Sequence, residues 1–379
     1  MRAQQVSCQS VAHRKRWTRL LSGVALACAA ALAAVGCTSG LPSSGSVNGQ
    51  GPETVPAVSG AEAAQAYQQW EAAAAASANA DNRTAELPYT TDVYRVTVST
   101  GLQIERHDNI RVPAGSARSG PAVFYLPEST GYPRWFVAER PTTYNLPRQS
   151  GTVPGAPGGI QWADQGSHDV LLFKQASATA RWQLASVSKL APGLSLPAFA
   201  VDGTGHIPTV SLSDRALRAR PDVTGPLQAA VVDDGPASPA SAVVAGGPLT
   251  TGIYDNERAG LLGLTAPRGD VLQWGLEGSI YPAVALRTAA GGALVLYSMY
   301  LNTIVQTQGS LAQSRPLTPG SPISVPNGVV PLLPHGQPAP RVKFEAQQTL
   351  SFAAIDPTAG NEKIQVIAIG GGWSYASAS

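Results

Sequence analysis

One serine–lysine pair in the sequence has the spacing of a nucleophile and its base. Residues 186–189 read Ser-Val-Ser-Lys, and in a Ser-x-x-Lys site the lysine takes the proton of the serine hydroxyl. That chemistry requires the two side chains to lie one helical turn apart. Residues 181–188 instead alternate in the manner of a strand, on which positions three apart point to opposite faces. We therefore interpret Ser186 and Lys189 as part of the surface end of a strand.

Two His-Asp dipeptides, at residues 107–108 and 168–169, are candidates for acid–base or metal chemistry. A metal site requires several such ligands brought together, and neither dipeptide has another histidine nearby in the sequence. Both lie in polar segments, so we interpret them as turn residues. His206 and His335 are isolated beside Gly and Pro. The sequence therefore predicts no metal site, no cofactor and no catalytic constellation.

The cysteines indicate an export signal. All three, at positions 8, 28 and 37, lie in the first 37 residues, which have a basic start and an uncharged stretch at 20–34. This is the layout of a secretory signal peptide, and the stretch is shorter than the ~20 residues of a membrane-spanning helix.

Residues 34–37, Ala-Val-Gly-Cys, resemble the bacterial lipobox, although the position three before the cysteine is usually Leu and here is Ala34. We expect the signal peptide 1–36 to be removed. A lipid such as palmitate on Cys37 would then hold the chain on the extracytoplasmic face of the cell membrane. An ordinary secretory signal cut nearby is the alternative.

Composition excludes several classes of protein. Residues 1–37 carry five of the 26 basic residues and none of the 24 acidic ones, so the remaining chain has a net charge of −3 and no basic block. Nucleic acid is therefore not an expected partner. No cysteine follows Cys37, which excludes disulfides and cysteine-based metal sites. With only 13% charged residues, 39 glycines and 31 prolines, the chain is expected to form short strands with many turns.

The order of elements suggests an internal repeat. A flexible tether at 37–58 precedes a capping box at Ser59–Glu62 and a helix to about residue 79. Strands are predicted at 92–99, 122–126, 134–138, 169–175 and 181–188. A second set comprises a helical zone at 251–264 and strands at 281–288, 293–302, 348–355 and 363–369. We therefore predict two tandem α+β domains, at 59–195 and 205–379, each with its own antiparallel sheet.

A helix followed by a curved antiparallel sheet resembles the cystatin-like fold, the nuclear-transport-factor-two-like or SnoaL-like superfamily. The tandem layout behind a lipobox resembles actinobacterial lipoproteins of unknown function. The resemblance is carried by the helix at 60–79, by residues 123–127 with 135–137, and by residues 170–173 with 182–184. It implies a cone of helices and sheet around a pocket, which serves catalysis in some members and only binding in others.

Two hypotheses for function follow. The first is a non-catalytic module of the cell envelope that binds a protein, a glycan or a small apolar ligand. The second is a hydrolase or isomerase with an acid–base pair in the cone of one domain, for which His107 and Asp108 are the candidates.

Overall fold

The computed structural model describes most of the chain after the tether. Cys37 and nearly all of the tether 37–58 lie outside the described residues, as does His335. The described residues belong to one compact unit. They are 57–78, 83–108, 117–144, 167–256, 271–306, 329–334 and 343–379.

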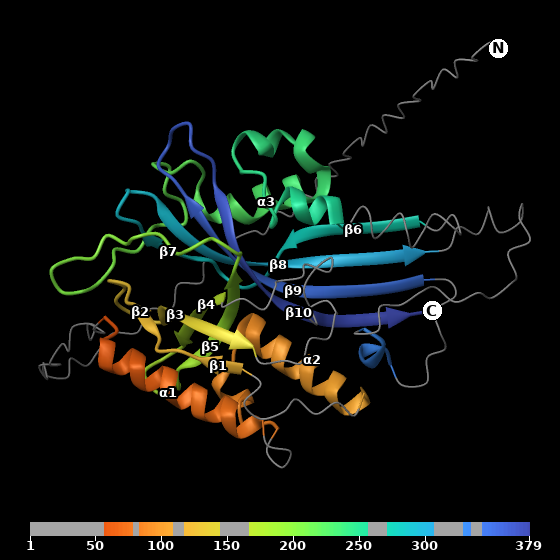
Figure 1. The fold of residues 1–379 in the computed structure, drawn as a ribbon, viewed down its shortest axis with the longest axis horizontal. Coiled ribbons are helices and arrows are strands. Elements are labelled where there is room, and N and C mark those ends of the chain that lie inside the picture. Colours follow the sequence, from red (N-terminus) through yellow and green to blue (C-terminus); the bar gives the residue numbers. More distant parts are fainter. Residues whose placement is uncertain are drawn as a thin grey trace, which may run out of the picture. The chain divides into compact units, whose positions relative to one another are not determined.

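The strands of the described segments form a single antiparallel sheet of ten strands, in the order β1-β3-β4-β5-β10-β9-β8-β6, with β2 also paired to β3 and β7 also paired to β8 (Figure 1). The first half of the sheet comprises β1 (Ala117–Ser119), β2 (Val123–Tyr125), β3 (Arg134–Tyr144), β4 (Ser167–Gln175) and β5 (Gln183–Leu190). The second half comprises β6 (Val271–Gly278), β7 (Val284–Arg287), β8 (Ala293–Gln306), β9 (Lys343–Asp356) and β10 (Gln365–Ala378). The α+β class is therefore confirmed.

The expectation of two separate sheets was wrong, because the last strand of each half pairs with the other. Leu190 and Lys189 of β5 lie opposite Ala368 and Ile369 of β10. The strand order is the same on each side of this seam. In the first half β1 and β2 pair with β3, which is followed by β4 and β5. In the second half β6 and β7 pair with β8, which is followed by β9 and β10. The order of elements therefore repeats, but within one continuous sheet.

Glycine in β10 makes this seam possible. A Cβ on Gly370 would lie 1.8 Å from the carbonyl oxygen of Val187 in β5. The hydroxyl of Ser351 in β9 donates to the same oxygen at 3.0 Å, and Ser188 donates to Ser351 at 2.9 Å. The absent side chain thus lets β5, β10 and β9 approach closely enough to share buried hydrogen bonds.

Helix α1 (Gly60–Ser77) begins at the predicted capping residue, since the Ser59 hydroxyl accepts from the Glu62 amide at 3.2 Å. Its Tyr67 and Trp70 are buried against Phe136 and Phe173 of the sheet. A short 3-10 helix, η2 (Leu87–Tyr89), follows. None of the described helices is long and apolar enough to cross a membrane.

Residues 92–108 form helix α2 (Asp92–Asp108), so the strand predicted at 92–99 was wrong. The β-branched residues there alternate as in a strand. The helix nevertheless buries Val93 and places Ile104 against the apolar cluster that contains Phe344. The Thr97 and Thr100 hydroxyls donate to carbonyl oxygens four residues earlier, at 3.1 and 2.9 Å. Packing against the sheet has therefore overridden β propensity.

Helix α3 (Thr224–Asp234) was not predicted, and of the predicted helical zone 251–264 residues 251–256 are helical and the rest lie outside the described residues. Asp233 of α3 accepts the backbone N–H of Leu276 in β6 at 3.0 Å, which covers part of a sheet edge. The remaining short 3-10 helices are η4 (Pro221–Val223), η5 (Gly235–Ala237), η6 (Pro239–Ala242) and η7 (Val330–Leu332).

One apolar cluster crosses the seam. Every second side chain of β3 packs in the cluster of α1, and every second side chain of β8 packs in the cluster of α3. The side chains between them belong to this central cluster. The connector, residues 191–210, lies over it: Ile207 donates to Leu126 O at 2.8 Å and Val210 donates to Ala285 O at 3.0 Å. Both halves thus share a core. The central cluster contains Trp135, Val137, Val170, Leu172, Ala185, Leu190, Ile207, Leu286, Leu294, Leu296, Ala353, Ile367 and Ala368.

We predict that Gly370→Ala destabilises the whole unit by roughly 2 kcal/mol or more, because the new methyl group overlaps the Val187 carbonyl. Urea unfolding followed by tryptophan fluorescence should show one transition at a lower midpoint. Gly278→Ala is the control, since a Cβ there meets nothing within 4 Å, and it should change the midpoint little. Two separate transitions, with only one of them shifted, would contradict a shared core.

Candidate functional site

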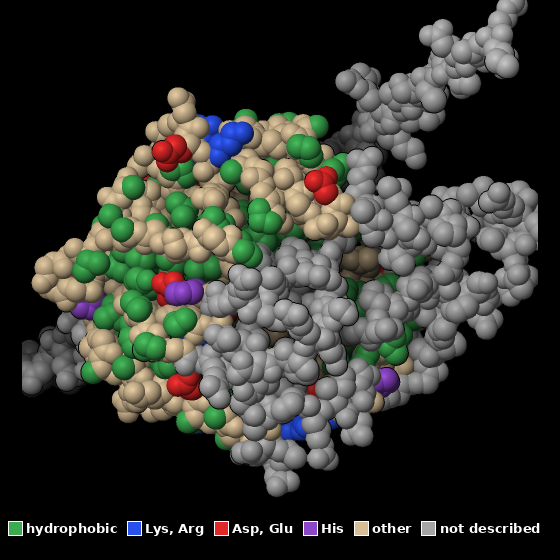
Figure 2. All heavy atoms as spheres, in the orientation of Figure 1, with side chains coloured by type: hydrophobic (Ala, Val, Ile, Leu, Met, Phe, Trp, Pro, Cys, Tyr) green, Lys and Arg blue, Asp and Glu red, His purple; other side chains and the backbone are tan. Residues whose placement is uncertain are grey.

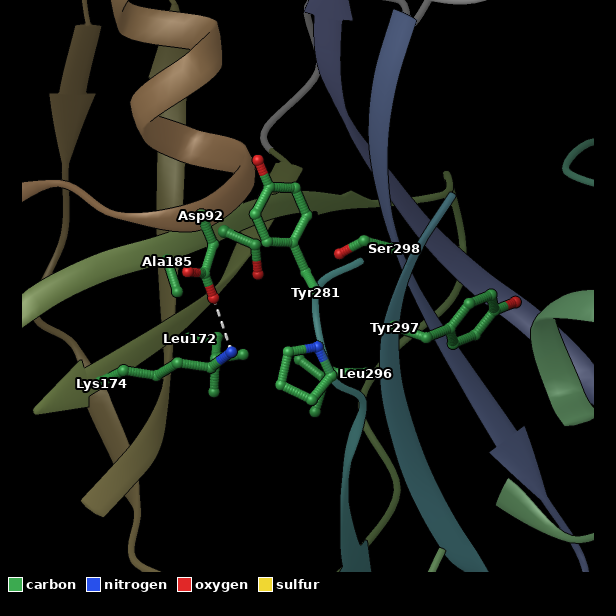
Figure 3. A pocket seen from close by; sticks show the side chains of 10 residues that line it. Asp92, Leu172, Lys174, Ala185, Tyr281, Leu296, Tyr297 and Ser298 are labelled. Atoms are coloured by element: carbon green, nitrogen blue, oxygen red, sulfur yellow. Dashed lines mark hydrogen bonds and ion pairs between the residues drawn. The ribbon is translucent and has the colours of Figure 1, made fainter. Parts of the chain in front are cut away.

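A narrow cleft lies at the edge of the central cluster, between the two halves of the sheet (Figure 3). Its cavity volume is about 10 Å³, about what a single water molecule requires and far below the roughly 300–1,000 Å³ of small-molecule sites. The polar residues lining it are Asp92, Lys174, Ser186, Tyr281 and Ser298, and the apolar ones include Leu172, Ala185 and Leu296.

The first half supplies an ion pair to the cleft. Lys174 Nζ on β4 lies 2.6 Å from Asp92 Oδ2 at the start of α2, and their side chains are 13% and 22% exposed. Thr91 donates its hydroxyl to the other carboxylate oxygen at 3.1 Å. Because Asp92 and Lys174 are the only charged residues that the described part of the chain contributes to the lining, these residues give the cleft no net charge.

The backbone at Asp92 is strained. Its φ is +47°, the left-handed region that residues other than glycine adopt at a cost, although aspartate tolerates it better than most. Such strain persists only where the surroundings fix the conformation. The ion pair to Lys174 and the bond from Thr91 are the contacts that hold this carboxylate in place.

The second half supplies hydroxyl groups. The Tyr281 side chain lies between Asp92 and Ser298, whereas the Tyr297 ring points away from the cleft (Figure 3), toward α3, where its hydroxyl donates to Gln228 at 2.7 Å. Burial raises the pKa of Tyr281, and the neighbouring Tyr300 hydroxyl and the charge of Asp92 add to that rise. Tyr281 therefore keeps its proton and serves as a hydrogen-bonding group.

The serine of the Ser-x-x-Lys motif lines the cleft, but its lysine does not. Both residues lie on β5, a strand as the sequence predicts, with Ser186 opposite Leu172 and Lys189 opposite Asp169. The expected surface position was wrong for Ser186, which is buried because β5 lies inside the sheet between β4 and β10. Being three apart on a strand, Ser186 and Lys189 point to opposite faces. Lys189 therefore cannot take the Ser186 proton.

The histidine–aspartate dipeptides do not lie in turns, contrary to our interpretation. Residues 107–108 form the end of α2, with His107 exposed. His168 and Asp169 lie on β4, facing opposite ways: His168 Nδ1 is 2.7 Å from Glu139 Oε1, and Asp169 accepts from Thr142 at 2.7 Å. The structure brings neither dipeptide to the cleft.

His206 lies in the connector and holds the start of the folded chain. Its Nε2 is 3.1 Å from the carbonyl oxygen of Val58, which is itself buried in the cluster beneath α1. Its Nδ1 is 2.9 Å from the Thr204 hydroxyl. His206 is therefore a structural residue.

A buried acid lies beneath α1 and was not anticipated from the sequence. Glu86 Oε1 accepts from Trp70 Nε1 at 2.9 Å and from the Tyr94 hydroxyl at 2.8 Å. Burial raises the pKa of Glu86, partly offset by these two hydrogen bonds. Both donors come from helices, so Glu86 joins α1 to α2 in the first half.

Of the cleft residues, the sequence motifs pointed only to Ser186. Asp92, Lys174, Tyr281 and Ser298 come from four separate segments, and only the continuous sheet and α2 bring them together. The visible face of the described residues shows few charged side chains, scattered among apolar and uncharged ones (Figure 2).

We predict that Asp92→Ala is less stable than Asp92→Gly by roughly 1 kcal/mol, because glycine adopts a positive φ without strain. Both variants lose the Lys174 pair equally, so their difference in urea midpoint reports the relief of backbone strain, reduced by the greater entropy of glycine in the unfolded chain. Equal midpoints would show that the local backbone relaxes without penalty.

Comparison with known proteins gives two matches. Residues 54–373 match the model of a family described as "Domain of unknown function (DUF8094)". The chain is 30% identical, over 193 residues, to a protein of Streptomyces avermitilis named "Uncharacterized lipoprotein". The match covers 49% of each chain, so it spans about half the length of that relative. No solved structure matches.

The family match covers most of the chain, including the whole described sheet except its last few residues. The chain therefore belongs to the family defined by DUF8094.

Proposed function

We propose that this protein is a lipoprotein of the cell envelope, held at the extracytoplasmic face of the cell membrane by a lipid, such as palmitate, on Cys37. The basic start, the uncharged stretch and the small residues before Cys37 support export and lipid attachment. The Streptomyces relative, which is named a lipoprotein, supports the same assignment.

We infer that each half of the sheet corresponds to one cystatin-like unit, and that the two units are fused through β5 and β10. The repeated strand order supports this inference. So do the helices α1 and α3, which each pack against the alternate side chains of their own half. The boundaries 59–195 and 205–379 then describe units of a single sheet.

The proposed binding role rests on one observation: hydrogen-bonding groups from both halves converge on a cleft whose two charged residues are paired with each other. Asp92 and Lys174 neutralise each other, Ser186 and Ser298 offer hydroxyls, and Tyr281 adds a hydroxyl that also interacts with Tyr300. A cleft of about 10 Å³ has room for one small polar group, not a whole ligand. These features favour a hydroxyl-bearing glycan or protein over a small apolar ligand.

Lipid attachment is tested by substitution. We expect Cys37→Ser to abolish incorporation of labelled palmitate and to release the protein from the membrane fraction or leave it unprocessed, because the acylated sulfur is lost. Cys28→Ser, within the same leader, is the matched control and should behave as the wild type. Normal trimming of Cys37→Ser, together with an unlabelled wild type, would show an ordinary secretory signal.

Binding is tested by filling the cleft. Ser298→Leu should abolish any rise in melting temperature that soluble envelope glycan fragments or peptides produce in the wild type, because the larger side chain occupies the cleft. Ser177→Leu, in the exposed turn between β4 and β5, should keep the rise. A panel that stabilises neither the wild type nor the control contradicts the proposal, and turnover of a compound would indicate the enzyme hypothesis instead.

A further inference from the structure

We propose that Asp356 acts as a proton-dependent latch, which fastens the segment 214–219, here called the strap, to the hairpin of β9 and β10. The strap precedes α3 in the second half and lies apart from the cleft residues in sequence. This inference does not depend on the proposed function.

Three backbone groups of the strap are bonded to the hairpin or to Asp356 itself. Arg218 N–H donates to Pro357 O at 2.8 Å, and Ala359 N–H donates to Ala216 O at 2.9 Å. Ala219 N–H donates to Asp356 Oδ1 at 3.4 Å. The carboxyl group is thus one of the attachment points of the strap.

The second carboxyl oxygen of Asp356 is buried without a hydrogen bond. Asp356 is 0% exposed, and its Oδ2 has no hydrogen-bond partner in the described part of the chain. The Nε of Arg218 is also buried without a partner, because this guanidinium donates to Gly360 O at 2.7 Å and Ala242 O at 3.1 Å. Among the described residues no ion pair neutralises Asp356, and a buried carboxylate without an ion pair is strongly disfavoured.

The charged groups around Asp356 do not outweigh the effect of burial, which disfavours the ionised carboxylate. Arg218 favours the ionised form and Asp214 opposes it, while Asp214 is itself paired with Arg287 of β7 at 2.8 Å. Lys363 of the hairpin donates to Ser241 O instead. Burial is the largest influence and raises the pKa of Asp356 from 3.8 to about 6.

The direction of the effect follows from proton linkage. The closed strap holds Asp356 protonated up to about pH 6, whereas an opened strap exposes a carboxyl with an ordinary pKa near 4. Below about pH 4 both states are protonated and closure is unaffected. Between about pH 4 and 6 the open state gains stability by losing its proton, and above that the effect is constant. Opening should therefore become more frequent by a factor on the order of 10² from pH 4 to pH 7.5.

Hydrogen exchange of the full chain tests the latch. Protection factors, which already correct for the intrinsic pH dependence of exchange, should fall on the order of 10²-fold from pH 4 to pH 7.5 at the amides of Arg218, Ala219 and Ala359. The amide of Val210, bonded to Ala285 O, serves as the internal control and should not change with them. Asp356→Asn should remove the pH dependence at the three strap amides.

Two results would overturn the latch. One is equal protection of the strap amides at both pH values in the wild type, and the other is the same pH dependence in Asp356→Asn. Should Asp356→Asn fail to fold, carboxyl ¹³C titration of Asp356 in the wild type decides the matter. A midpoint near 6 supports the latch, and a midpoint below 4.5 rejects it.

Discussion

The pairing of β5 with β10 is the contact on which the rest of the structure depends. Each of these strands would otherwise end its own half with a row of unpaired backbone groups, and such edges invite association with other chains. Their pairing converts two edges into the interior of one sheet. It also creates the central cluster, since Leu190 and Ala368 lie opposite each other there. The cleft then forms beside this cluster, where both halves contribute to one lining.

Local patterns in the sequence identified most strands but not how they combine. The apolar residues of β4, β5, β7, β8 and β9 alternate where a strand buries one face and run continuously where it buries both, and both patterns are visible in the sequence. The same signal misled at residues 92–99, where β-branched residues lie on a helix because tertiary packing favours it. The pairing of two edge strands depends on segments that are distant in the sequence, so hydrophobic periodicity cannot predict it. The importance of Gly370 is visible only in the structure, where Val187 lies beside it.

The residues of the candidate site were even harder to predict from the sequence than the pairing of the strands. A lipobox is contiguous, so residues 34–37 could be interpreted directly. The cleft residues have ordinary neighbours: Lys174 ends an apolar strand, and Tyr281 precedes a proline. The groups that attracted attention in the sequence, the His-Asp dipeptides, instead divide between two faces of β4 or end a helix. Dipeptides on a strand cannot act together, because successive side chains alternate.

The contact between Val58 and His206 has a mechanical consequence. Val58 is buried and stands where the chain enters the fold, and its carbonyl is held by a residue of the connector. A pull on the preceding chain, as from a membrane moving against a fixed partner, would reach His206 before it could unwind α1. From His206 the force would pass to neighbours bonded to Leu126 in the first half and Ala285 in the second. The force would thus be distributed over both halves of the sheet, so that neither half unfolds separately.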